Sequence, residues 1–358
     1  MRILFIISDL TYRGAAKQLT LLAKRLPGEE FQRRVCVLGK AGPWAEELQT
    51  AGVILDVLNW RWTLDLPAFG RLRFVLGAYQ TDVLHVWGQT ALQAAVLAGG
   101  LRHGRLIVTR PLPTRHSSGK LNWWDRWLLR RAECVTAMSP SAADMWGRLE
   151  VDPSRFVVIP PGVEVLHALP IPAADALPPR TILCVGPLER RKGFRDAIWV
   201  LDILRFLHQD LQLAFVGRGP DRSAIERFAH DARVADRVQF LGERSDLPAL
   251  MGQAELVWVP SHGAGGINVV LEAMMAGRPV VASALLEIAE IVVPGETGFL
   301  APPGDQAAFA RQTRLLLDDA ELRRKMGDAG RCRALELFSA RAMAQKFADI
   351  YEGRVNPC

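Results

Sequence analysis

A glycine-rich loop at Gly263–Gly266 has the residue types and the spacing to bind an anion. It joins the apolar run 255–259 to a helical pattern at 267–276. The glycines let the backbone come close to a ligand, because they place no side chain in the way. The helix that follows would point its free N–H groups at the same place, which favours a phosphate. Glu272 lies about one and a half turns into that helix. It is near enough to accept hydrogen bonds from hydroxyl groups beside the phosphate.

A basic turn is the second candidate for binding a phosphate. Arg190, Arg191 and Lys192 follow the buried run 181–185, which ends at Gly186. A cation beside the start of a helix suits a diphosphate, and Lys192 is the first choice for that contact. Most runs of charge are simply solvated, which is the alternative here. The position at the carboxyl end of a first strand favours the binding role.

Four weaker candidates follow or end other strand-like runs. Gly217 could line a nucleotide, although a tight turn explains a lone G-x-G equally well. Gly14 opens a helical pattern after the first strand, where it could face a ligand. His85 and Arg110 are the candidates for catalysis in the first half of the chain. A packed structural role is the alternative for His85, whereas Arg110 lies just past a strand end.

A helical pattern at 120–131 interleaves three tryptophans with three arginines. A basic, aromatic helix of this kind can lie at an anionic membrane surface. The alternative is a helix that packs its tryptophans against its own domain. The net charge of +6 also falls mainly in the first 170 residues, which fits an anionic membrane or a phosphorylated acceptor. Because no nucleic-acid-binding motif is recognisable, we expect no nucleic-acid partner.

Two sets of strand-like runs would position these residues. The first set comprises 2–7, 33–38, 53–58, 82–86, 105–109, 133–138 and 156–159. The second set comprises 181–185, 211–216, 237–241, 255–259 and 278–282. Helical patterns lie between the runs, and this alternation predicts parallel sheets covered on both faces. We therefore expect an α/β protein with two doubly wound, Rossmann-like domains that hold ligand loops at the carboxyl ends of their strands.

The proline-rich stretch 169–179 separates the two sets, since its prolines interrupt both helix and sheet. It predicts a first domain at 1–170 and a second at 171–338, which is an ordinary size for each. Helical patterns without strands fill 305–352. The last of them, 339–352, could pack back onto the first domain.

Composition indicates a cytoplasmic protein without a metal site. The five cysteines are an odd number, widely spaced and without a C-x-x-C pair, so we expect free thiols in a reducing compartment. No run reaches the roughly 18 apolar residues that predict a membrane span. The apolar start at 2–7 is too short for a signal-peptide core and is expected to be a strand.

Motifs along nearly the whole chain resemble the retaining glycosyltransferases of family 4, which have the GT-B fold. In chain order the motifs are Gly14–Ala16, Asp82–His85, Phe156–Glu164, Gly186–Gly193, Phe215–Pro220, Arg237–Gly242, Glu272–Val281 and Glu290–Leu300. The resemblance implies transfer of a sugar from a nucleotide-diphosphate donor to a glycan, a lipid-linked acceptor or a small molecule. It also implies retention of the anomeric configuration without a metal or other cofactor. The donor would bind in the second domain and the acceptor in the first, on either side of a central cleft.

The resemblance also assigns roles to residues by position. Lys192 would neutralise the leaving diphosphate, which is the main catalytic task because negative charge grows there in the transition state. Glu272 would hold donor hydroxyl groups, typically on the ribose. The amide groups facing the donor would be those of Gly265, Gly266, Ile267, Asn268 and Val269.

The sequence departs from the family pattern at the site itself. Ala264 stands where the family commonly has a second glutamate, and Pro187 stands where an arginine often joins the lysine. Arg110 lies where many members present a histidine. The loss of both donor contacts could silence the site, unless Arg190 or Arg191 replaces the cation. The alternatives to an active transferase are therefore a non-catalytic relative that binds a nucleotide, a glycan or a protein, and an epimerase or phosphorylase on the same fold.

Overall fold

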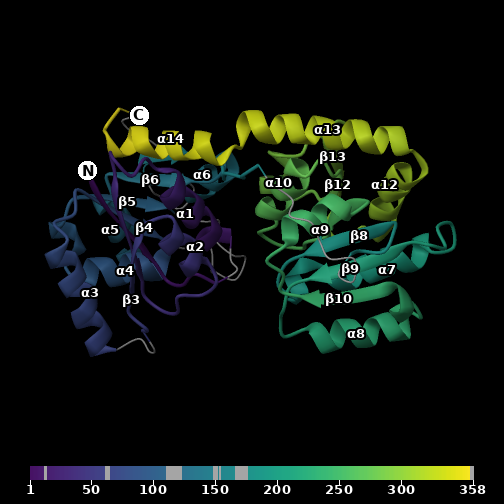
Figure 1. Cartoon of the computed structure of the whole chain (residues 1–358), viewed down its shortest axis with the longest axis horizontal. Coiled ribbons are helices and arrows are strands. Elements are labelled where there is room, and N and C mark those ends of the chain that lie inside the picture. Colours follow the sequence, from purple (N-terminus) through teal and green to yellow (C-terminus); the bar gives the residue numbers. More distant parts are fainter. Residues whose placement is uncertain are drawn as a thin grey trace. The chain divides into compact units, whose positions relative to one another are not determined.

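The computed structural model describes residues 1–11, 14–60, 65–109, 123–147, 152, 155–165 and 176–354. The chain forms two compact units (Figure 1). The first unit consists of Met1–Gly162 together with Ala340–Cys358, and the second consists of Val163–Ser339. Each unit has its own parallel sheet.

The first unit is built on seven parallel strands in the order β3-β2-β1-β4-β5-β6-β7. They are β1 (Arg2–Ile7), β2 (Gln32–Val37), β3 (Ile54–Val57), β4 (Val83–Trp87), β5 (Arg105–Thr109), β6 (Cys134–Ala137) and β7 (Phe156–Val158). The chain runs outward from β1 to β3 and then returns to β4 on the other side of β1. Loops after β1 and β4 therefore diverge, which is where open α/β sheets bind ligands.

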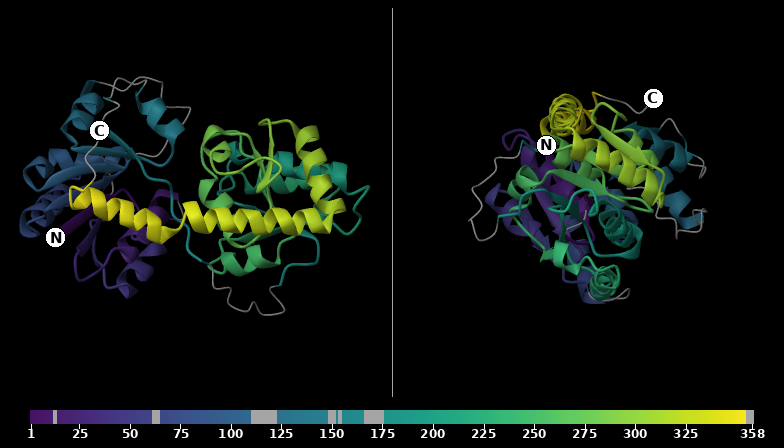
Figure 2. Two further views of the ribbon diagram at one scale, coloured as in Figure 1. Left: turned by 90° about the horizontal axis from the view of Figure 1, so that it is seen from above. Right: turned by 90° about the vertical axis from the view of Figure 1, so that its right-hand side faces the viewer.

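Helices cover both faces of this first sheet (Figure 2). They are α1 (Gly14–Arg25), α2 (Trp44–Thr50), α3 (Leu66–Ala78), α4 (Gln89–Leu97), α5 (Trp123–Arg131), α6 (Pro140–Gly147) and α14 (Ala340–Tyr351). Alternate residues of β1 point to opposite faces. Ile3 and Phe5 pack with residues of α1, α2 and α14, whereas Leu4 and Ile6 pack with residues of α3, α4 and α5. Burial of both faces explains why the central strands of this sheet are mainly apolar.

The second unit is built on six parallel strands in the order β10-β9-β8-β11-β12-β13. They are β8 (Thr181–Val185), β9 (Gln212–Val216), β10 (Val238–Gly242), β11 (Leu256–Val259), β12 (Val280–Ser283) and β13 (Gly298–Ala301). Its helices are α7 (Phe194–Leu204), α8 (Arg222–Asp231), α9 (Leu247–Gln253), α10 (Ile267–Met275), α11 (Leu286–Ala289), α12 (Gln306–Asp318) and α13 (Ala320–Leu337). The two doubly wound parallel sheets predicted from the sequence are therefore confirmed. Strand β13 was not among the predicted runs, because it is short, begins with glycine and is followed by two prolines.

The chain leaves the first unit at Gly162, before the proline-rich stretch at which the sequence places the boundary. Gly162 exchanges two hydrogen bonds with the side chain of Gln18 in α1, at 2.8 and 2.7 Å. Val163 instead donates its N–H to the carbonyl oxygen of Phe338, at 2.7 Å, and its side chain is buried in the core of the second unit. Side-chain and backbone hydrogen bonds thus set this boundary, which composition alone does not reveal. Residues 166–175 lie outside the described part of the chain.

Helix α14 is joined to the first unit by a buried hydrogen-bond network around His85. Nδ1 of His85 lies 2.6 Å from the hydroxyl oxygen of Tyr351, and Nε2 lies 2.7 Å from that of Thr109. The His85 side chain has no exposed surface. Burial lowers the pKa of His85 to about 3, so the ring is neutral at pH 7.

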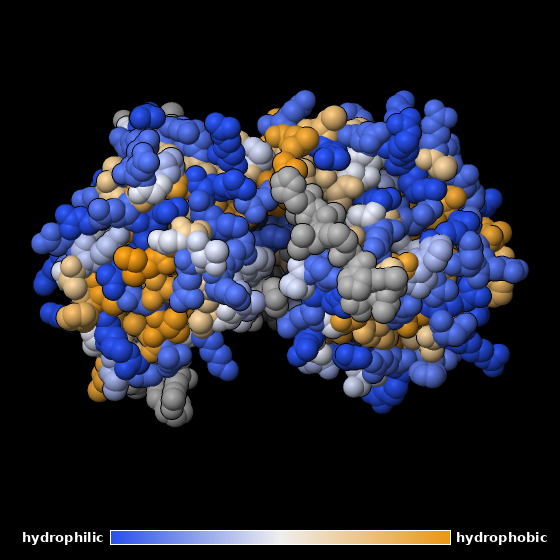
Figure 3. All heavy atoms as spheres, in the orientation of Figure 1, coloured by the Kyte–Doolittle hydropathy of each residue, from blue (hydrophilic) through white to orange (hydrophobic). Residues whose placement is uncertain are grey.

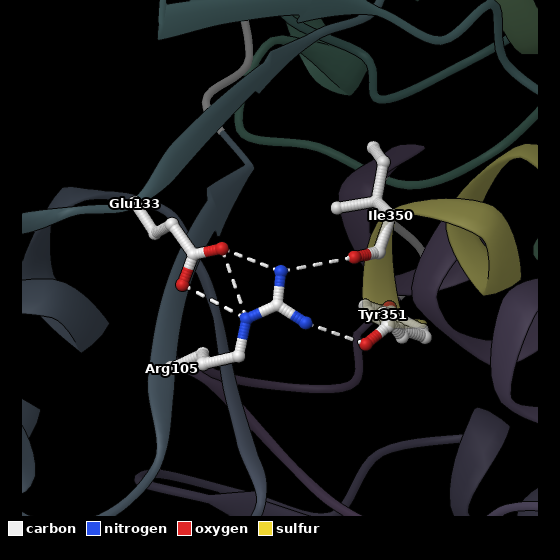
Figure 4. A network of polar contacts seen from close by, with 4 residues as sticks. All are labelled: Arg105, Glu133, Ile350 and Tyr351. Carbon is white, nitrogen blue, oxygen red and sulfur yellow. Dashed lines mark hydrogen bonds and ion pairs between the residues drawn. The ribbon is translucent and has the colours of Figure 1, made fainter. Parts of the chain in front are cut away.

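The C-terminal end of α14 is capped by Arg105 of β5 (Figure 4). Its guanidinium donates to the carbonyl oxygens of Tyr351, at 2.6 Å, and Ile350, at 3.3 Å. Its Nε lies 2.9 Å from both carboxylate oxygens of Glu133. A cation at the end of a helix binds carbonyl groups that lack partners within the helix and interacts favourably with the helix dipole.

The Tyr351→Phe variant is expected to lower the free energy of unfolding by about 1–3 kcal/mol. The substitution keeps the ring but leaves a fully buried nitrogen of His85 without a partner. Tyr79→Phe is the matched control, because the Tyr79 hydroxyl donates to the carbonyl oxygen of Gln32 at an exposed position, at 2.9 Å. Urea unfolding measures both changes, and equal losses in the two variants would contradict this role of the network.

Among the described residues, no helix is both long and apolar enough to cross a membrane. The face seen in Figure 3 is mostly hydrophilic, with apolar residues gathered in the region of α3 and α4 of the first unit. Phe74 of α3 and Leu97 of α4 are among the large apolar side chains that are exposed.

Candidate functional site

The second sheet reverses its strand order between β8 and β11. The chain goes from β8 outward to β9 and β10, and then crosses to β11, β12 and β13 on the other side. The loops after β8 and β11 therefore diverge at the carboxyl edge of the sheet, where open α/β sheets bind ligands. Lys192 follows β8 and Gly265–Gly266 follows β11, so the two sequence candidates come from this pair of strands.

Lys192 is a buried cation at the start of a helix. It ends the short 3-10 turn Arg190–Lys192, directly before Gly193 and α7, and is only 8% exposed. Burial and the neighbouring Arg191 lower the pKa of Lys192 to about 8, against the opposing effect of Glu287 and Glu189. No hydrogen bond or ion pair of its ammonium group occurs within the described residues. Because burying an unpaired charge is costly, this position suits a bound anion.

The glycine loop places the backbone next to this ammonium group. Gly265 and Gly266 have φ angles of +105° and +115°, a region that glycine adopts readily. A Cβ on Gly265 would lie 2.9 Å from Nζ of Lys192 and 3.5 Å from Nη1 of Arg191. Gly266 is also the N-cap residue of α10, whose first amide groups have no partner within the helix. A cation beside the N-terminus of a helix is an arrangement that suits a phosphate group.

Arg191 ties the two loops together. Its Nη1 donates to the carbonyl oxygen of Ala264, at 2.8 Å, and its Nε donates to Glu189, at 2.7 Å. Its own carbonyl accepts the N–H of His262, at 2.8 Å. Arg191 is thus a structural link as well as a cation, and both Arg190 and Arg191 are exposed in this turn.

The remaining candidates of the second unit occupy the same edge of the sheet. Ile267, Asn268 and Val269 form the first turn of α10 and are partly exposed. Glu272 lies further along that helix and is 5% exposed. The structure therefore groups these residues with the glycine loop, as their order in the sequence implies.

Gly186 and Gly217 directly follow the neighbouring strands β8 and β9 and touch each other. A Cβ on Gly217 would overlap the carbonyl oxygen of Gly186, so the absence of a side chain at Gly217 allows close packing of two backbones. This agrees with the tight-turn alternative for Gly217. A Cβ on Gly186 would lie 3.9 Å from the side-chain carbons of Lys192, so Gly186 borders the site directly.

The structure places His85 in the packed position that was the alternative to a catalytic role. Its side chain is wholly buried, and both ring nitrogens are occupied by Tyr351 and Thr109, so it packs α14 instead. Gly14 is exposed at the first position of α1. Arg110 lies outside the described residues.

The aromatic helix α5 turns most of its tryptophan surface inward. Trp124 and Trp127 stack with ring centroids 5.1 Å apart and pack against the core, whereas Trp123 is 75% exposed. Arg131 lies over the ring of Trp127, at 4.8 Å from its centroid. The packing alternative therefore accounts for two of the three tryptophans. Residues 120–122 of this predicted helix lie outside the described part.

Glu287 also lies at the carboxyl edge of the second sheet, although no motif of the sequence points to it. This residue is 3% exposed on α11, and its Oε1 accepts the N–H of Gly265. The available signal is its position shortly after β12, at the same carboxyl edge as the loops after β8 and β11.

Within the described residues there is no cluster of histidine, cysteine, aspartate or glutamate that could hold a metal ion. Cys36, Cys134 and Cys184 are buried free thiols, as predicted.

Comparison with known proteins identifies the family. Residues 12–165 match the family described as Glycosyltransferase Family 4, and residues 173–333 match Glycosyl transferases group 1. Glycogen synthase of Mycobacterium tuberculosis is 30% identical over 236 residues, covering 63% of this chain but only 56% of that enzyme. The GDP-mannose-dependent alpha-(1-6)-phosphatidylinositol monomannoside mannosyltransferase of Mycolicibacterium smegmatis is 30% identical over 327 residues, covering 82% of each chain.

A solved structure shows the same fold. Anabaena HepE in complex with UDP has a TM-score of 0.82 and 21% identity to this chain, covering 99% of it and 100% of HepE. The two doubly wound units thus form the GT-B fold. With the two family matches and the mannosyltransferase at 30% identity, the chain belongs to glycosyltransferase family 4.

Proposed function

We propose that this protein transfers a sugar from a nucleotide-diphosphate donor to an acceptor, with retention of the anomeric configuration. The observation that carries the proposal is the juxtaposition of Lys192 and Gly265 at the β8–β11 edge. It combines a buried ammonium group without an ion partner in the described residues, a backbone open to close approach, and the N-terminus of α10. The relatives support a sugar-nucleotide donor, since HepE is solved with UDP and the mannosyltransferase depends on GDP-mannose.

The proposed mechanism uses charge that the second unit already holds. Lys192 and the first amides of α10 neutralise the diphosphate as it departs, which lowers the barrier because the negative charge is largest in the transition state. Arg191 adds a second positive charge beside Gly265. These groups supply the stabilisation that a metal ion would otherwise provide, so the proposed reaction is metal-independent. Glu272 binds donor hydroxyl groups from further along α10.

The acceptor is proposed to bind at the corresponding edge of the first unit. Gly14 begins α1 after β1, and Gly88, with φ of +91°, is the N-cap residue of α4 after β4. These are the loops at the strand-order reversal of that sheet. A glycan, a lipid-linked glycan or a small molecule is the proposed acceptor class. Contact of α5 with an anionic membrane stays a prediction, in which the exposed Trp123 would take part.

Turnover tests the proposal. The protein is incubated with UDP-, GDP- and ADP-hexoses and a panel of acceptors, and nucleoside diphosphate release is measured. We expect turnover with donors of one base, an unchanged rate in EDTA, and a product whose anomeric configuration by NMR matches that of the donor. Donor binding without transfer to any acceptor would instead support a non-catalytic relative. Conversion of the donor to an epimer without transfer would identify an epimerase.

A further inference from the structure

A buried carboxylate lies in the candidate site although the sequence has none in the glycine loop. Glu287 is on α11, which follows β12, the neighbour of β11 in the sheet. Its Oε1 accepts the N–H of Gly265, and the side chain is 3% exposed. The carbonyl of the preceding residue, Ala264, is held by Arg191 at 2.8 Å. The Glu287 carboxylate is therefore fixed against the backbone of residues 264–265.

The charges around Glu287 belong to the same site. The pKa of Glu287 is raised, mainly because the side chain is buried and also because Glu290 is near. The hydrogen bond from Gly265 and the positive charges of Lys192 and Arg191 oppose this increase. Lys192 is near enough to interact electrostatically, but no ion pair joins the two side chains. Three neighbouring strands, β8, β11 and β12, thus bring a cation, a backbone amide and a carboxylate together.

The second carboxylate oxygen of Glu287, Oε2, can still accept hydrogen bonds. Within the described residues, no donor reaches Oε2 of Glu287. Oε2 is not one of the fully buried polar atoms without a partner in the described part of the chain, so it is accessible to an incoming group. Hydroxyl groups of a sugar are suitable donors, because carboxylate oxygens accept them strongly. One oxygen held by Gly265 leaves the other in a fixed position for such a group.

We propose that Glu287 binds hydroxyl groups of the donor sugar and so supplies, from α11, the carboxylate that position 264 lacks. The proposal rests on the proposed function of this site and adds a specificity-determining residue to it. In this arrangement Lys192 binds the diphosphate and Glu287 binds the sugar, and the glycine loop lies between the two residues. Glu287 therefore contributes to recognition of a sugar nucleotide and little to recognition of the nucleoside diphosphate alone.

The Glu287→Gln variant separates these contributions. Its amide oxygen can still accept the N–H of Gly265, while its amide nitrogen replaces the free acceptor Oε2. We expect kcat/KM for the sugar nucleotide to fall about tenfold to a hundredfold, the loss of one hydrogen bond to a charged group. The Kd of the nucleoside diphosphate should stay within about twofold of the wild-type value. Glu296→Gln is the control, because Glu296 is an exposed carboxylate in the loop before β13.

A rescue experiment gives a result that a structural role alone would not produce. Adding Ala264→Glu to the Glu287→Gln variant returns a carboxylate to the same part of the loop, and we expect kcat/KM to recover at least severalfold. If Glu287→Gln fails to fold, Glu287→Asp keeps the charge, withdraws the carboxylate by one methylene and should show the same selective loss.

Two results would overturn the inference about Glu287 and leave the proposed function intact. Either kcat/KM is unchanged in Glu287→Gln while the wild type is active, or the Kd of the nucleoside diphosphate rises by the same factor as kcat/KM falls. The second result would make Glu287 a positioning residue for the glycine loop. A wild-type protein that neither binds nor turns over any sugar nucleotide would overturn the proposed function itself, and the inference with it.

Discussion

The Lys192→Ala variant is expected to lose about two to three orders of magnitude in kcat/KM for the sugar nucleotide. Removal of one group that stabilises developing negative charge typically has an effect of this size. Lys192 is the buried cation at the β8–β11 edge, and its ammonium group lies against the Gly265 backbone. Alanine would leave the departing diphosphate with the amides of α10 and the more exposed Arg191.

Arg195→Ala is the matched control for this loss of charge. Arg195 lies in the same segment but is exposed over the ring of Phe228, 4.4 Å from its centroid, and should leave kcat/KM near the wild-type value. An unchanged rate in Lys192→Ala, or an equal loss in both variants, would contradict the assignment of Lys192 to the diphosphate.

The lowered pKa of Lys192 predicts that kcat/KM depends on pH. The pKa of Lys192 is lowered to about 8, so the free protein carries the charge below this pH and loses it above. We expect kcat/KM to fall as the pH rises through about 8, since this parameter reports ionisations of the free enzyme. Lys192→Arg should keep its charge and lack this decline.

The Gly193→Ala variant is expected to lower the free energy of unfolding of the second unit by about 3 kcal/mol and to reduce activity as well. Gly193 has φ of +68°, and a Cβ there would overlap the carbonyl oxygen of Pro260. The left-handed conformation costs alanine about 1–2 kcal/mol, and relief of the overlap costs roughly 1–3 kcal/mol more. The loops after β8 and β11 would have to separate, which moves Lys192 away from Gly265.

Gly277→Ala distinguishes these two effects. Gly277 also has φ of +68°, but a Cβ there would meet nothing within 4 Å. It should therefore show only the conformational cost and keep wild-type kcat/KM. Thermal unfolding and turnover of the two variants are compared. Equal destabilisation of the Gly193→Ala and Gly277→Ala variants would show that the close approach of the two loops does not contribute to stability.

The part of the site that the sequence predicts is the part determined by strand ends. Lys192 and Gly265–Gly266 each follow a buried apolar run, and parallel strands bring such positions to one edge. Their approach in the structure follows from β8 and β11 being neighbours. The two-sheet fold was predictable for the same reason, since strands and helices alternate along the chain.

The sequence says least about side chains whose partners lie far away along the chain. His85 has a strand-end position typical of a functional residue, yet its ring binds Tyr351, which is 266 residues further along the chain. Glu287 belongs to no recognisable motif, and its contact is with the N–H of Gly265, which follows a neighbouring strand. The unit boundary at Gly162 likewise depends on hydrogen bonds with Gln18. Periodicity and composition carry no information about such contacts.

The most direct test of the central claim is calorimetric titration of UDP, GDP and ADP into the wild type and Lys192→Ala. The claim is that the β8–β11 edge of the second unit binds the diphosphate of a sugar nucleotide through Lys192. We expect the wild type to bind one of the three nucleotides, and Lys192→Ala to bind it at least about tenfold more weakly, the loss of one charge-assisted hydrogen bond. Absence of binding to all three, or equal affinity of the two proteins, would contradict the claim.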